Sequence, residues 1–503
     1  MRAQTFKNLD VFLILVGVKL LSVVVVQTYF VPDEYYQSLE VAHKFAFGYG
    51  HLTWEWHQGI RSYAYPLIFS AFYKIMKVLR LDTPVAVIFV PRVAQALLSA
   101  YADLCFYKWS GTKKWAVFII STSWFWFYTS SRTLINTFET CLTVIALSKF
   151  PWIGSKEEPS SSFIWLVSTL FFIRPTSAIM WFPLCLYHIA ISEKSGVRLL
   201  ISRYIPISLI VLVLSTLLDS LAHGSFIVTT FNFMKANIWQ NVGTHYGTMP
   251  WHWYLSIGLP AVLGVLILPF LMAVLVILKQ RSNHPNELAM LGTIVFSILI
   301  LSFLAHKEFR FVLPLLPIIA FIASRFLSAW SRKASMWRIW MVSIIIFVSN
   351  AFPAYYMGVN HQRGTIDVMQ GLREIAVKDP ENVSFLFLMP CHSTPLYSHL
   401  HMNVSTRFLT CNPNLNKISN YKDEADHFYM NPNNWLRQHY PPNKPLPSHI
   451  ICFDNLVPVI GNDILTRYER VKQYFHCDIS VSPRIGNYVL IHERSDFDIE
   501  WTT

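Results

Sequence analysis

Long apolar segments recur through the first 356 residues, and they constrain the fold more than any other feature. Each is close to the roughly 17 to 25 residues that a helix needs to cross a bilayer. Only 14% of the residues are charged, whereas soluble domains carry about a quarter. The sequence therefore predicts an α-helical polytopic membrane protein with about 11 transmembrane helices, counting the two short segments 163–173 and 176–192. The predicted spans are 9–30, 85–107, 115–130, 134–150, 163–173, 176–192, 200–222, 254–278, 288–305, 310–328 and 337–356.

The distribution of basic residues predicts how these helices are oriented. Lys and Arg gather in the loops 108–114, 193–203, 279–282 and 332–338, which places these loops and the N-terminus in the cytosol. The net charge of +12 then needs no nucleic-acid partner, and no nucleic-acid-binding motif is present. Residues 63–80 are apolar but end in basic residues, so we predict an interfacial amphipathic helix there.

The composition becomes polar after residue 356. Strand-like runs at 384–388 and 450–453 alternate with helix-like stretches such as 367–377, a pattern typical of a small α/β domain. We therefore predict a transmembrane domain over 1–356, with an outer loop at 31–84 that carries interfacial helices. A lumenal soluble α/β domain is predicted over 357–503.

This C-terminal region also holds two glycosylation sequons and four cysteines. Asn382 and Asn403 are the acceptor residues, on the side that the charge pattern places outside the cytosol. The cysteines allow up to two disulfides in three possible connectivities. They are Cys391, Cys411, Cys452 and Cys477. Their spacing does not resemble a metal site, so no metal is expected.

An acidic pair follows the first apolar segment. Asp33 and Glu34 come directly after Pro32, and carboxylates beside hydrocarbon are costly enough to suggest a function. Such a group can act as a general base toward an attacking hydroxyl. Alternatively, the pair caps the helix expected at 35–45, or one acid caps while the other reacts.

Aromatic residues surround a further acid in the same outer loop. Trp54 and Trp56 flank Glu55, and aromatic faces with interleaved polar groups suit sugars. An aromatic belt at the membrane interface is the alternative. The predicted sugar- or acceptor-binding residues are Trp54, Glu55, Trp56, Tyr36, Trp251 and His252.

A basic cluster lies at another predicted membrane edge. His306, Lys307 and Arg310 surround Glu308. The point charge of Lys307 and the planar fork of Arg310 suit a phosphate, and Glu308 could orient either cation. Basic side chains that reach from the bilayer to its interface would give the same pattern.

Arg132 is a further candidate for phosphate binding. Asn136 follows it by one helical turn, so both side chains can face one cavity. Arg174, between two short apolar segments, could line the same cavity. The alternative for Arg132 is a buried ion pair with Glu139.

Together these motifs resemble a known family. Pro32-Asp33-Glu34, the segment 132–139 and the segment 306–311 are similar to signatures of the dolichol-phosphate-mannose-dependent mannosyltransferases of the endoplasmic reticulum. This is glycosyltransferase family 22, which has a GT-C fold. The resemblance extends over about 1–356, and the segments 47–56, 61–66 and 250–254 most resemble the branch that adds the third mannose of GPI anchors. The family usually has His before Pro-Asp-Glu, whereas Val31 stands here.

The resemblance implies an inverting transfer of mannose. The donor would be dolichol-phosphate-mannose, the acceptor a GPI precursor, and the product an α-1,2 linkage. Asp33 would be the base, and Glu34 would orient the acceptor or replace Asp33. The donor phosphate would be held by Arg310, Lys307, His306 and Arg132. No cofactor is implied, and the active site would face the lumen of the endoplasmic reticulum.

Other functions fit part of this pattern. A related family member could act on N-glycan precursors or add the fourth GPI mannose. A transporter or scramblase also places charges at helix ends and uses broken helices, but no internal repeat is visible and the charges lie at one face. A non-catalytic subunit of a transferase complex is the third alternative.

Overall fold

The computed structural model describes residues 2–155, 161–192, 195–416, 418–461, 464–480 and 482–495, with side chains from residue 8. Glu193 and Lys194 of the predicted loop 193–203 lie outside this range. Contacts group the chain into two compact units. The first comprises Met1–Val24, Glu55–Tyr65 and Pro91–Ala354, and the second comprises Val25–Trp54, Pro66–Val90 and Tyr355–Thr503. The domain division at residue 356 stays a prediction.

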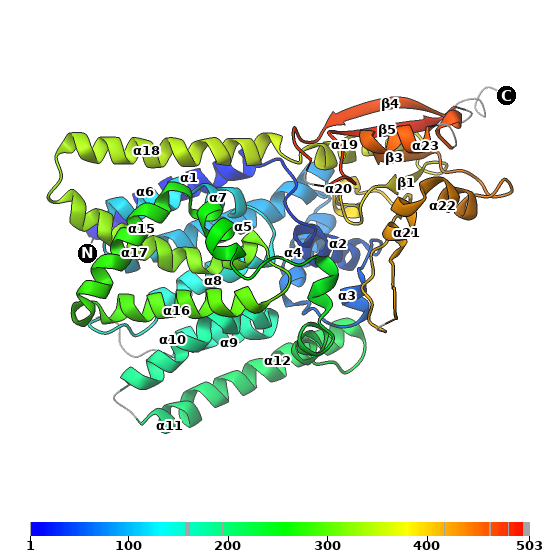
Figure 1. Cartoon of the computed structure of the whole chain (residues 1–503). Coiled ribbons are helices and arrows are strands. Elements are labelled where there is room, and N and C mark those ends of the chain that lie inside the picture. The colour runs from blue at the N-terminus through cyan, green and yellow to red at the C-terminus, as the bar shows by residue number, and fades with distance from the viewer. Residues whose placement is uncertain are drawn as a thin grey trace. The chain divides into compact units, whose positions relative to one another are not determined.

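The first unit is helical (Figure 1). Within the described residues, seven segments of the chain are long and apolar enough to cross a membrane. They are Asn8–Val25, Pro84–Ser110, Gly196–His223, Tyr254–Lys279, Pro285–Phe303, Phe309–Ser331 and Met336–Lys378. The helices are α1 (Arg2–Val25), α5 (Pro84–Ser110), α6 (Lys114–Thr122), α7 (Trp124–Thr129), α8 (Ile135–Ser148), α9 (Ser162–Ile173), α10 (Ala178–Ile191), α11 (Gly196–Leu199), α12 (Ile205–His223), α13 (Thr229–Met234), α14 (Leu259–Leu263), α15 (Ile267–Lys279), α16 (Pro285–Phe303), α17 (Leu316–Ser331) and α18 (Met336–Tyr355).

One predicted span is interrupted, and the predicted break at Arg174 is present. The segment 115–130 breaks at Ser123, which is extended with ψ 111°, and the Trp124 N–H donates to Asn350 Oδ1 at 3.0 Å. The bond satisfies a backbone donor that water cannot reach. Between α9 and α10, Arg174 is extended because Pro175 disfavours helical geometry in the residue before it.

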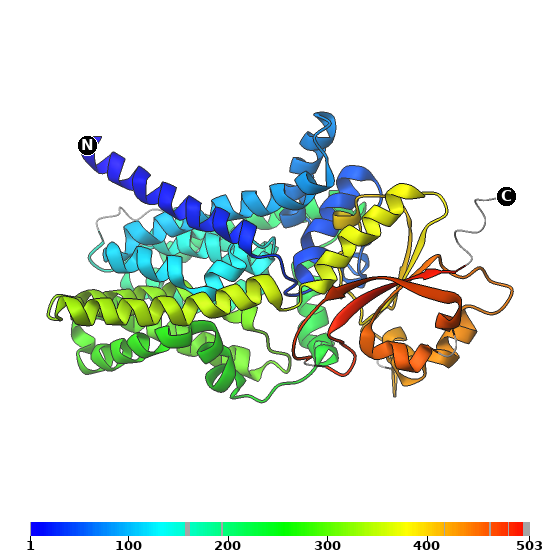
Figure 2. The ribbon, with the colours of Figure 1, turned by 90° about the horizontal axis from the view of Figure 1, so that it is seen from above.

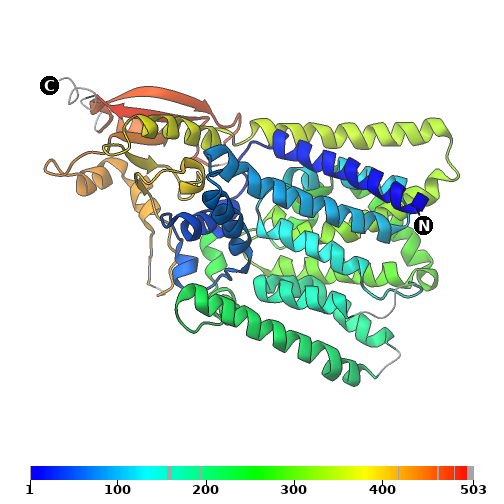
Figure 3. The same cartoon turned by 180° about the vertical axis from the view of Figure 1, so that it is seen from behind.

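A buried ion pair joins α1 and α5. Lys19 Nζ lies 2.9 Å from Asp103 Oδ2, and Trp126 Nε1 donates to Asp103 Oδ1 at 2.9 Å. Charges inside a membrane domain persist when they pair with one another. The lysine that interrupts the first apolar segment therefore has its partner on α5. Figure 3 shows α1 together with the other helices of the first unit.

The second unit contains a five-stranded mixed sheet of order β2-β1-β3-β5-β4. β1, β2 and β3 are parallel, and β5 pairs antiparallel with β3 and β4. The strands predicted at 384–388 and 450–453 are confirmed. The strands are β1 (Ser384–Leu388), β2 (Ser405–Phe408), β3 (His449–Phe453), β4 (Tyr468–Phe475) and β5 (Tyr488–Arg494).

Helices cover both faces of this sheet. Alternate residues of a strand point to opposite faces. Leu386, Leu388 and Ile450 join a core with α21 (Glu424–Met430), α22 (Pro432–His439) and α23 (Val457–Ile460). The predicted helix 367–377 is α19 (Gly364–Lys378), which packs on β4 and β5 (Figure 2).

Most of the outer loop, residues 25–54 and 66–90, also belongs to the second unit. Its helical turns are η1 (Tyr35–Leu39), α2 (Glu40–Phe47) and α4 (Ala64–Val78), the last over the helix predicted at 63–80. Glu40 is fully buried and accepts hydrogen bonds from the N–H groups of Leu396 and Ser398 and the Ser398 hydroxyl. These bonds dock α2 against α20 (Tyr397–Leu400).

One of the two possible disulfides is present. Cys391 and Cys411 are bonded with their Cα atoms 5.9 Å apart, whereas Cys452 and Cys477 are buried free thiols. Both sequon residues, Asn382 and Asn403, are exposed.

Candidate active site

The acidic pair begins a helical turn in the second unit. The carbonyl of Pro32 accepts the N–H groups of Tyr35 and Tyr36, each at 3.0 Å. Asp33 is half-buried and Glu34 is buried. No side-chain hydrogen bond of Glu34 caps this turn, so capping does not explain its position.

A histidine from the C-terminal region lies beside this turn. The His392 ring centroid is 4.3 Å from that of Tyr36, whose hydroxyl donates to Thr394 O at 2.9 Å. Burial and, to a smaller extent, the nearby His51 lower the pKa of His392 to about 4, although Asp33 opposes the shift. The predicted sugar contact Tyr36 is therefore buried, and the sequence pattern did not indicate His392.

Glu308 organises the basic cluster in the first unit. Arg310 donates to it through Nε at 2.7 Å and Nη2 at 2.6 Å, and His306 Nε2 lies 3.1 Å from Oε1. Burial raises the pKa of Glu308, but Arg310 and His306 outweigh burial and bring it to about 2. Glu308 therefore orients Arg310, one of the two cations considered for it, and contacts His306 instead of Lys307.

Lys307 points into its own loop. Its ammonium donates to the carbonyls of Met249, at 3.1 Å, and Leu304. The Met249 N–H in turn donates to Ala305 O at 3.0 Å. Lys307 thus fastens the segment before α14 to the loop before η9 (Phe309–Leu315), and its contact with phosphate stays a prediction.

The Arg132 segment reaches the same corner. Asn136 Nδ2 donates to the Arg310 carbonyl at 3.2 Å. Arg132 is buried, donates to Tyr128 O at 3.1 Å and lies 4.2 Å from the Tyr128 ring centroid. Glu139 pairs with Arg174 at 2.8 Å, so the ion pair considered for Arg132 is made by Arg174.

Four predicted acceptor residues lie in the first unit: two contact neighbouring side chains, and two are exposed. Glu55 pairs with Arg61 at 2.6 Å, and Trp56 is buried with its ring 4.6 Å from that of Tyr63. Trp251 and His252 are exposed before η6 (Tyr254–Gly258). Trp54, the first residue of α3 (Trp54–His57), is half-buried in the second unit.

Asp219 positions the segment that carries Glu55 and Trp56. This buried residue of α12 accepts hydrogen bonds from Ser62 Oγ at 3.0 Å, Tyr63 N at 2.9 Å and Thr229 Oγ1 at 2.7 Å. An acid inside an apolar span is costly. The sequence signal for Asp219 is thus an acid within the predicted span 200–222.

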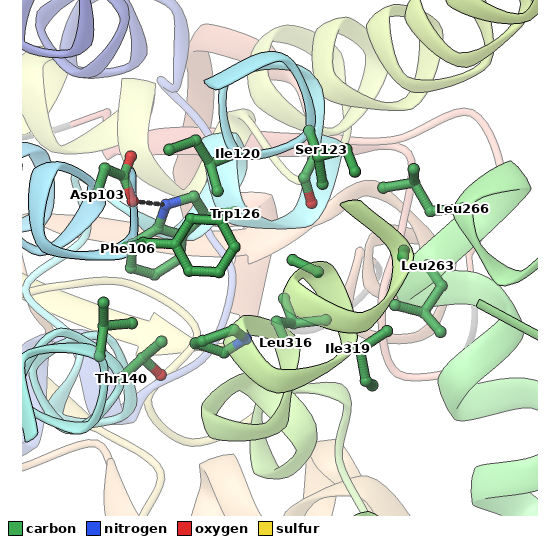
Figure 4. Close-up of a pocket in the computed structure, with 15 residues that line it drawn as sticks. Asp103, Phe106, Ile120, Ser123, Trp126, Thr140, Leu263, Leu266, Leu316 and Ile319 are labelled. Carbon is green, nitrogen blue, oxygen red and sulfur yellow. Dashed lines mark hydrogen bonds between the residues drawn. The ribbon is translucent and has the colours of Figure 1, made fainter. Parts of the chain in front are cut away.

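The first unit contains an apolar pocket (Figure 4). Phe106, Trp126, Leu263, Leu316 and Ile319 line it, and Asp103 is the one charged residue among the described residues that line it. Thr140, also in the lining, donates to the Asn136 carbonyl at 2.7 Å. Leu316 directly follows η9, the turn that carries Arg310. A charged corner beside an apolar pocket suits a ligand with an anionic head and a hydrocarbon tail.

Comparisons with known proteins identify the family. Residues 10–401 match the Alg9-like mannosyltransferase family. The chain belongs to this family.

Three relatives of this mannosyltransferase match over nearly its whole length. GPI mannosyltransferase 3 of Drosophila melanogaster is 48% identical over 94% of this chain and 85% of its own. GPI alpha-1,2-mannosyltransferase 3 of Danio rerio is 43% identical over 98% of this chain and 92% of its own. GPI alpha-1,2-mannosyltransferase 3 of Homo sapiens is 40% identical over 97% of this chain and 87% of its own. The mannosyltransferase is therefore a glycosyltransferase, and the family resemblance seen in the sequence is confirmed.

Solved structures agree with the predicted fold class. ArnT from Cupriavidus metallidurans in the apo state has a TM-score of 0.58 at 10% identity, covering 97% of this chain and 98% of its own. The same protein bound to undecaprenyl phosphate has a TM-score of 0.51 at 11% identity, with 98% of each chain covered. The mannosyltransferase thus has the fold of a multi-pass membrane glycosyltransferase.

Proposed function

We propose that this enzyme transfers mannose from dolichol-phosphate-mannose to the second mannose of a GPI-anchor precursor and forms an α-1,2 linkage. The observation that carries the proposal is the identity of 40% to 48%, over 94% to 98% of the chain, to relatives named as GPI mannosyltransferases. Identity at this level over a whole chain favours a shared acceptor as well as a shared reaction.

The proposed reaction is a single displacement. The acceptor hydroxyl oxygen bonds to C1 of mannose as the bond from C1 to the phosphate oxygen breaks, and dolichyl phosphate leaves with that electron pair. Asp33 takes the hydroxyl proton as general base. Glu34 orients the acceptor, and no resident cofactor or metal takes part. Attack opposite the leaving group inverts the β-linked donor to an α-linked product.

The leaving phosphate gains negative charge, which cations stabilise most where they are already oriented. Arg310 and His306 are held by Glu308, and the Arg132 segment is tied to Arg310 through Asn136. We assign charge compensation to Arg310, His306 and Arg132. Lys307 holds the loop through its carbonyl contacts. The acceptor-binding role of Glu55, Trp54, Trp56, Tyr36, Trp251 and His252 remains part of the proposal.

The apolar pocket supports a lipid-linked donor. Its apolar lining would accept part of an isoprenoid chain, and its link to Arg310 through Thr140 and Asn136 favours a phosphate at the corner with the chain in the pocket. We therefore expect a large side chain at Ala320, which lines the pocket, to raise KM for the donor and leave KM for the acceptor unchanged.

We also propose that the enzyme lies in the membrane of the endoplasmic reticulum with its active site in the lumen. The exposed Asn382 and Asn403 and the disulfide between Cys391 and Cys411 support this compartment, because disulfides persist in oxidising environments. Loss of glycan from Asn382→Gln and Asn403→Gln variants of the cell-expressed enzyme would support lumenal exposure. An unglycosylated wild-type protein would oppose it.

A transfer assay tests the function. The purified full-length enzyme in lipid nanodiscs receives labelled dolichol-phosphate-mannose and one of three acceptors: a dimannosyl GPI, a trimannosyl GPI or an N-glycan precursor. We expect transfer to the dimannosyl GPI alone, and its abolition in Asp33→Asn and Arg310→Ala variants whose thermal unfolding is normal. Transfer to either other acceptor in its place would overturn the acceptor assignment.

A further inference from the structure

His392 is held in an unusual backbone conformation. Its φ is +57°, a left-handed value that few residues other than glycine adopt and that surrounding structure must enforce. Two contacts enforce it here. The neighbouring Cys391 is bonded to Cys411, and the His392 carbonyl accepts the Tyr29 hydroxyl at 2.5 Å.

This conformation lays the imidazole on the turn that carries Asp33. The ring lies 4.3 Å from the Tyr36 ring and 5.8 Å from that of Phe408, between centroids. Tyr36 follows Asp33 by three residues in the same short helical segment. The negative charge of Asp33 acts on the imidazole as well. His392 therefore lies beside the turn that carries the candidate base.

The environment of His392 favours its neutral form. Burial and His51 bring its pKa to about 4, although Asp33 opposes the shift. A neutral imidazole offers one N–H donor and one acceptor. It can hydrogen-bond a carboxylate without adding the positive charge that would weaken that carboxylate as a proton acceptor.

We propose that His392 is a positioning residue, which orients the Asp33 carboxylate toward the attacking hydroxyl of the acceptor. The inference rests on the proposed role of Asp33 as the general base. It gives the disulfide-closed segment 391–411 a part in the reaction, because that segment delivers the imidazole to Asp33.

Two substitutions separate this role from backbone strain. His392→Gly removes the imidazole but allows the left-handed backbone. His392→Asn also tolerates that backbone and keeps a polar donor. We expect His392→Gly to lower kcat roughly 10- to 100-fold, as misplacement of a reacting group does, with KM for both substrates little changed. We expect His392→Asn to recover most of the loss.

His401→Gly is the matched control. His401 lies in the same region, is also left-handed with a φ of +47°, and contacts His43, with 3.0 Å between ring nitrogens. We expect its kcat to match wild type even if its thermal unfolding temperature falls. A kcat of His392→Gly equal to that of His401→Gly would overturn the proposal, as would equal losses of kcat in His392→Gly and His392→Asn.

Asp33→Asn in the same assay distinguishes this inference from the proposed function. An active Asp33→Asn enzyme would overturn the base assignment and the positioning role together. An inactive Asp33→Asn enzyme beside a fully active His392→Gly enzyme would overturn the positioning role alone.

Discussion

A single carboxylate, that of Glu308, fixes the direction of two neighbouring side chains in the basic corner. Glu308 accepts two hydrogen bonds from Arg310 and lies within hydrogen-bond distance of His306. A paired fork of this kind loses less entropy on binding an anion than a free arginine does. Glu308 opposes the donor phosphate by charge but presents Arg310 in one orientation.

The first prediction concerns Glu308→Gln. The amide keeps the shape but loses the charge-assisted bonds, so we expect kcat/KM for the donor to fall about tenfold, equivalent to about 1.4 kcal/mol. Because the pKa of Glu308 is about 2, this residue stays ionised from pH 5 to pH 8 and the ratio of variant to wild type should stay constant there. Steady-state kinetics across that range measures it.

Glu374→Gln is the control for this prediction. Glu374 also pairs with a cation, Lys472, at 2.6 Å, but it is exposed on α19. Its loss should leave kcat/KM unchanged. If Glu308→Gln were as active as this control, the orientation of Arg310 by Glu308 would have no part in catalysis.

Some of these residue contacts could be predicted and others could not. Glu308 lies two residues from Arg310, so the local pattern indicated their pairing. The carbonyls that hold Lys307 include that of Met249, and His392 meets Tyr36 across more than three hundred residues. Such contacts depend on tertiary packing, which a motif does not encode.

At the scale of helices, the buried pair of Lys19 and Asp103 ties α1 to α5. Removing one partner leaves a charge in a membrane interior, which costs about 3–5 kcal/mol for a buried pair. We therefore predict that Lys19→Met and Asp103→Asn each lower the thermal unfolding temperature of the detergent-purified enzyme. The double variant keeps an acceptor for Trp126 and should recover most of the loss. A double variant less stable than both single ones would contradict this account.

Glu40 provides a second prediction at this scale, in the docking of α2. It accepts three hydrogen bonds from Leu396 and Ser398. Glu40→Ala would leave these donors unpaired at about 1–3 kcal/mol each, whereas Glu40→Gln keeps one acceptor oxygen. We expect faster amide exchange at 396–400 in Glu40→Ala than in Glu40→Gln, measured by hydrogen–deuterium exchange. Equal exchange in both variants would show that the carboxylate oxygen does not hold this segment.

Across the whole molecule, local patterns predicted the individual helices and strands better than they predicted which elements group into each of the two units. The length of the apolar segments indicated the helices of the first unit, and the two strand-like runs at 384–388 and 450–453 indicated β1 and β3. The sequence did not show that 25–54 would group with the C-terminal region. That grouping depends on contacts such as Glu40 with Ser398 and Tyr36 with Thr394, which join residues far apart in the chain.

The last prediction is that acid destabilises the second unit of the molecule selectively. Burial lowers the pKa of His43 from 6.5 to about 3 and those of His392, His476 and His492 to about 4. Between these values and about 6.5 the unfolded chain binds protons that the folded unit does not, so stability is full above pH 6.5 and falls as the pH drops toward 4.

We expect amide exchange in β3 and β5, corrected for its intrinsic pH dependence, to accelerate between pH 7 and pH 5. Exchange in α16, inside the membrane domain, should not change. Equal acceleration in α16 would assign the effect to global unfolding instead of these histidines.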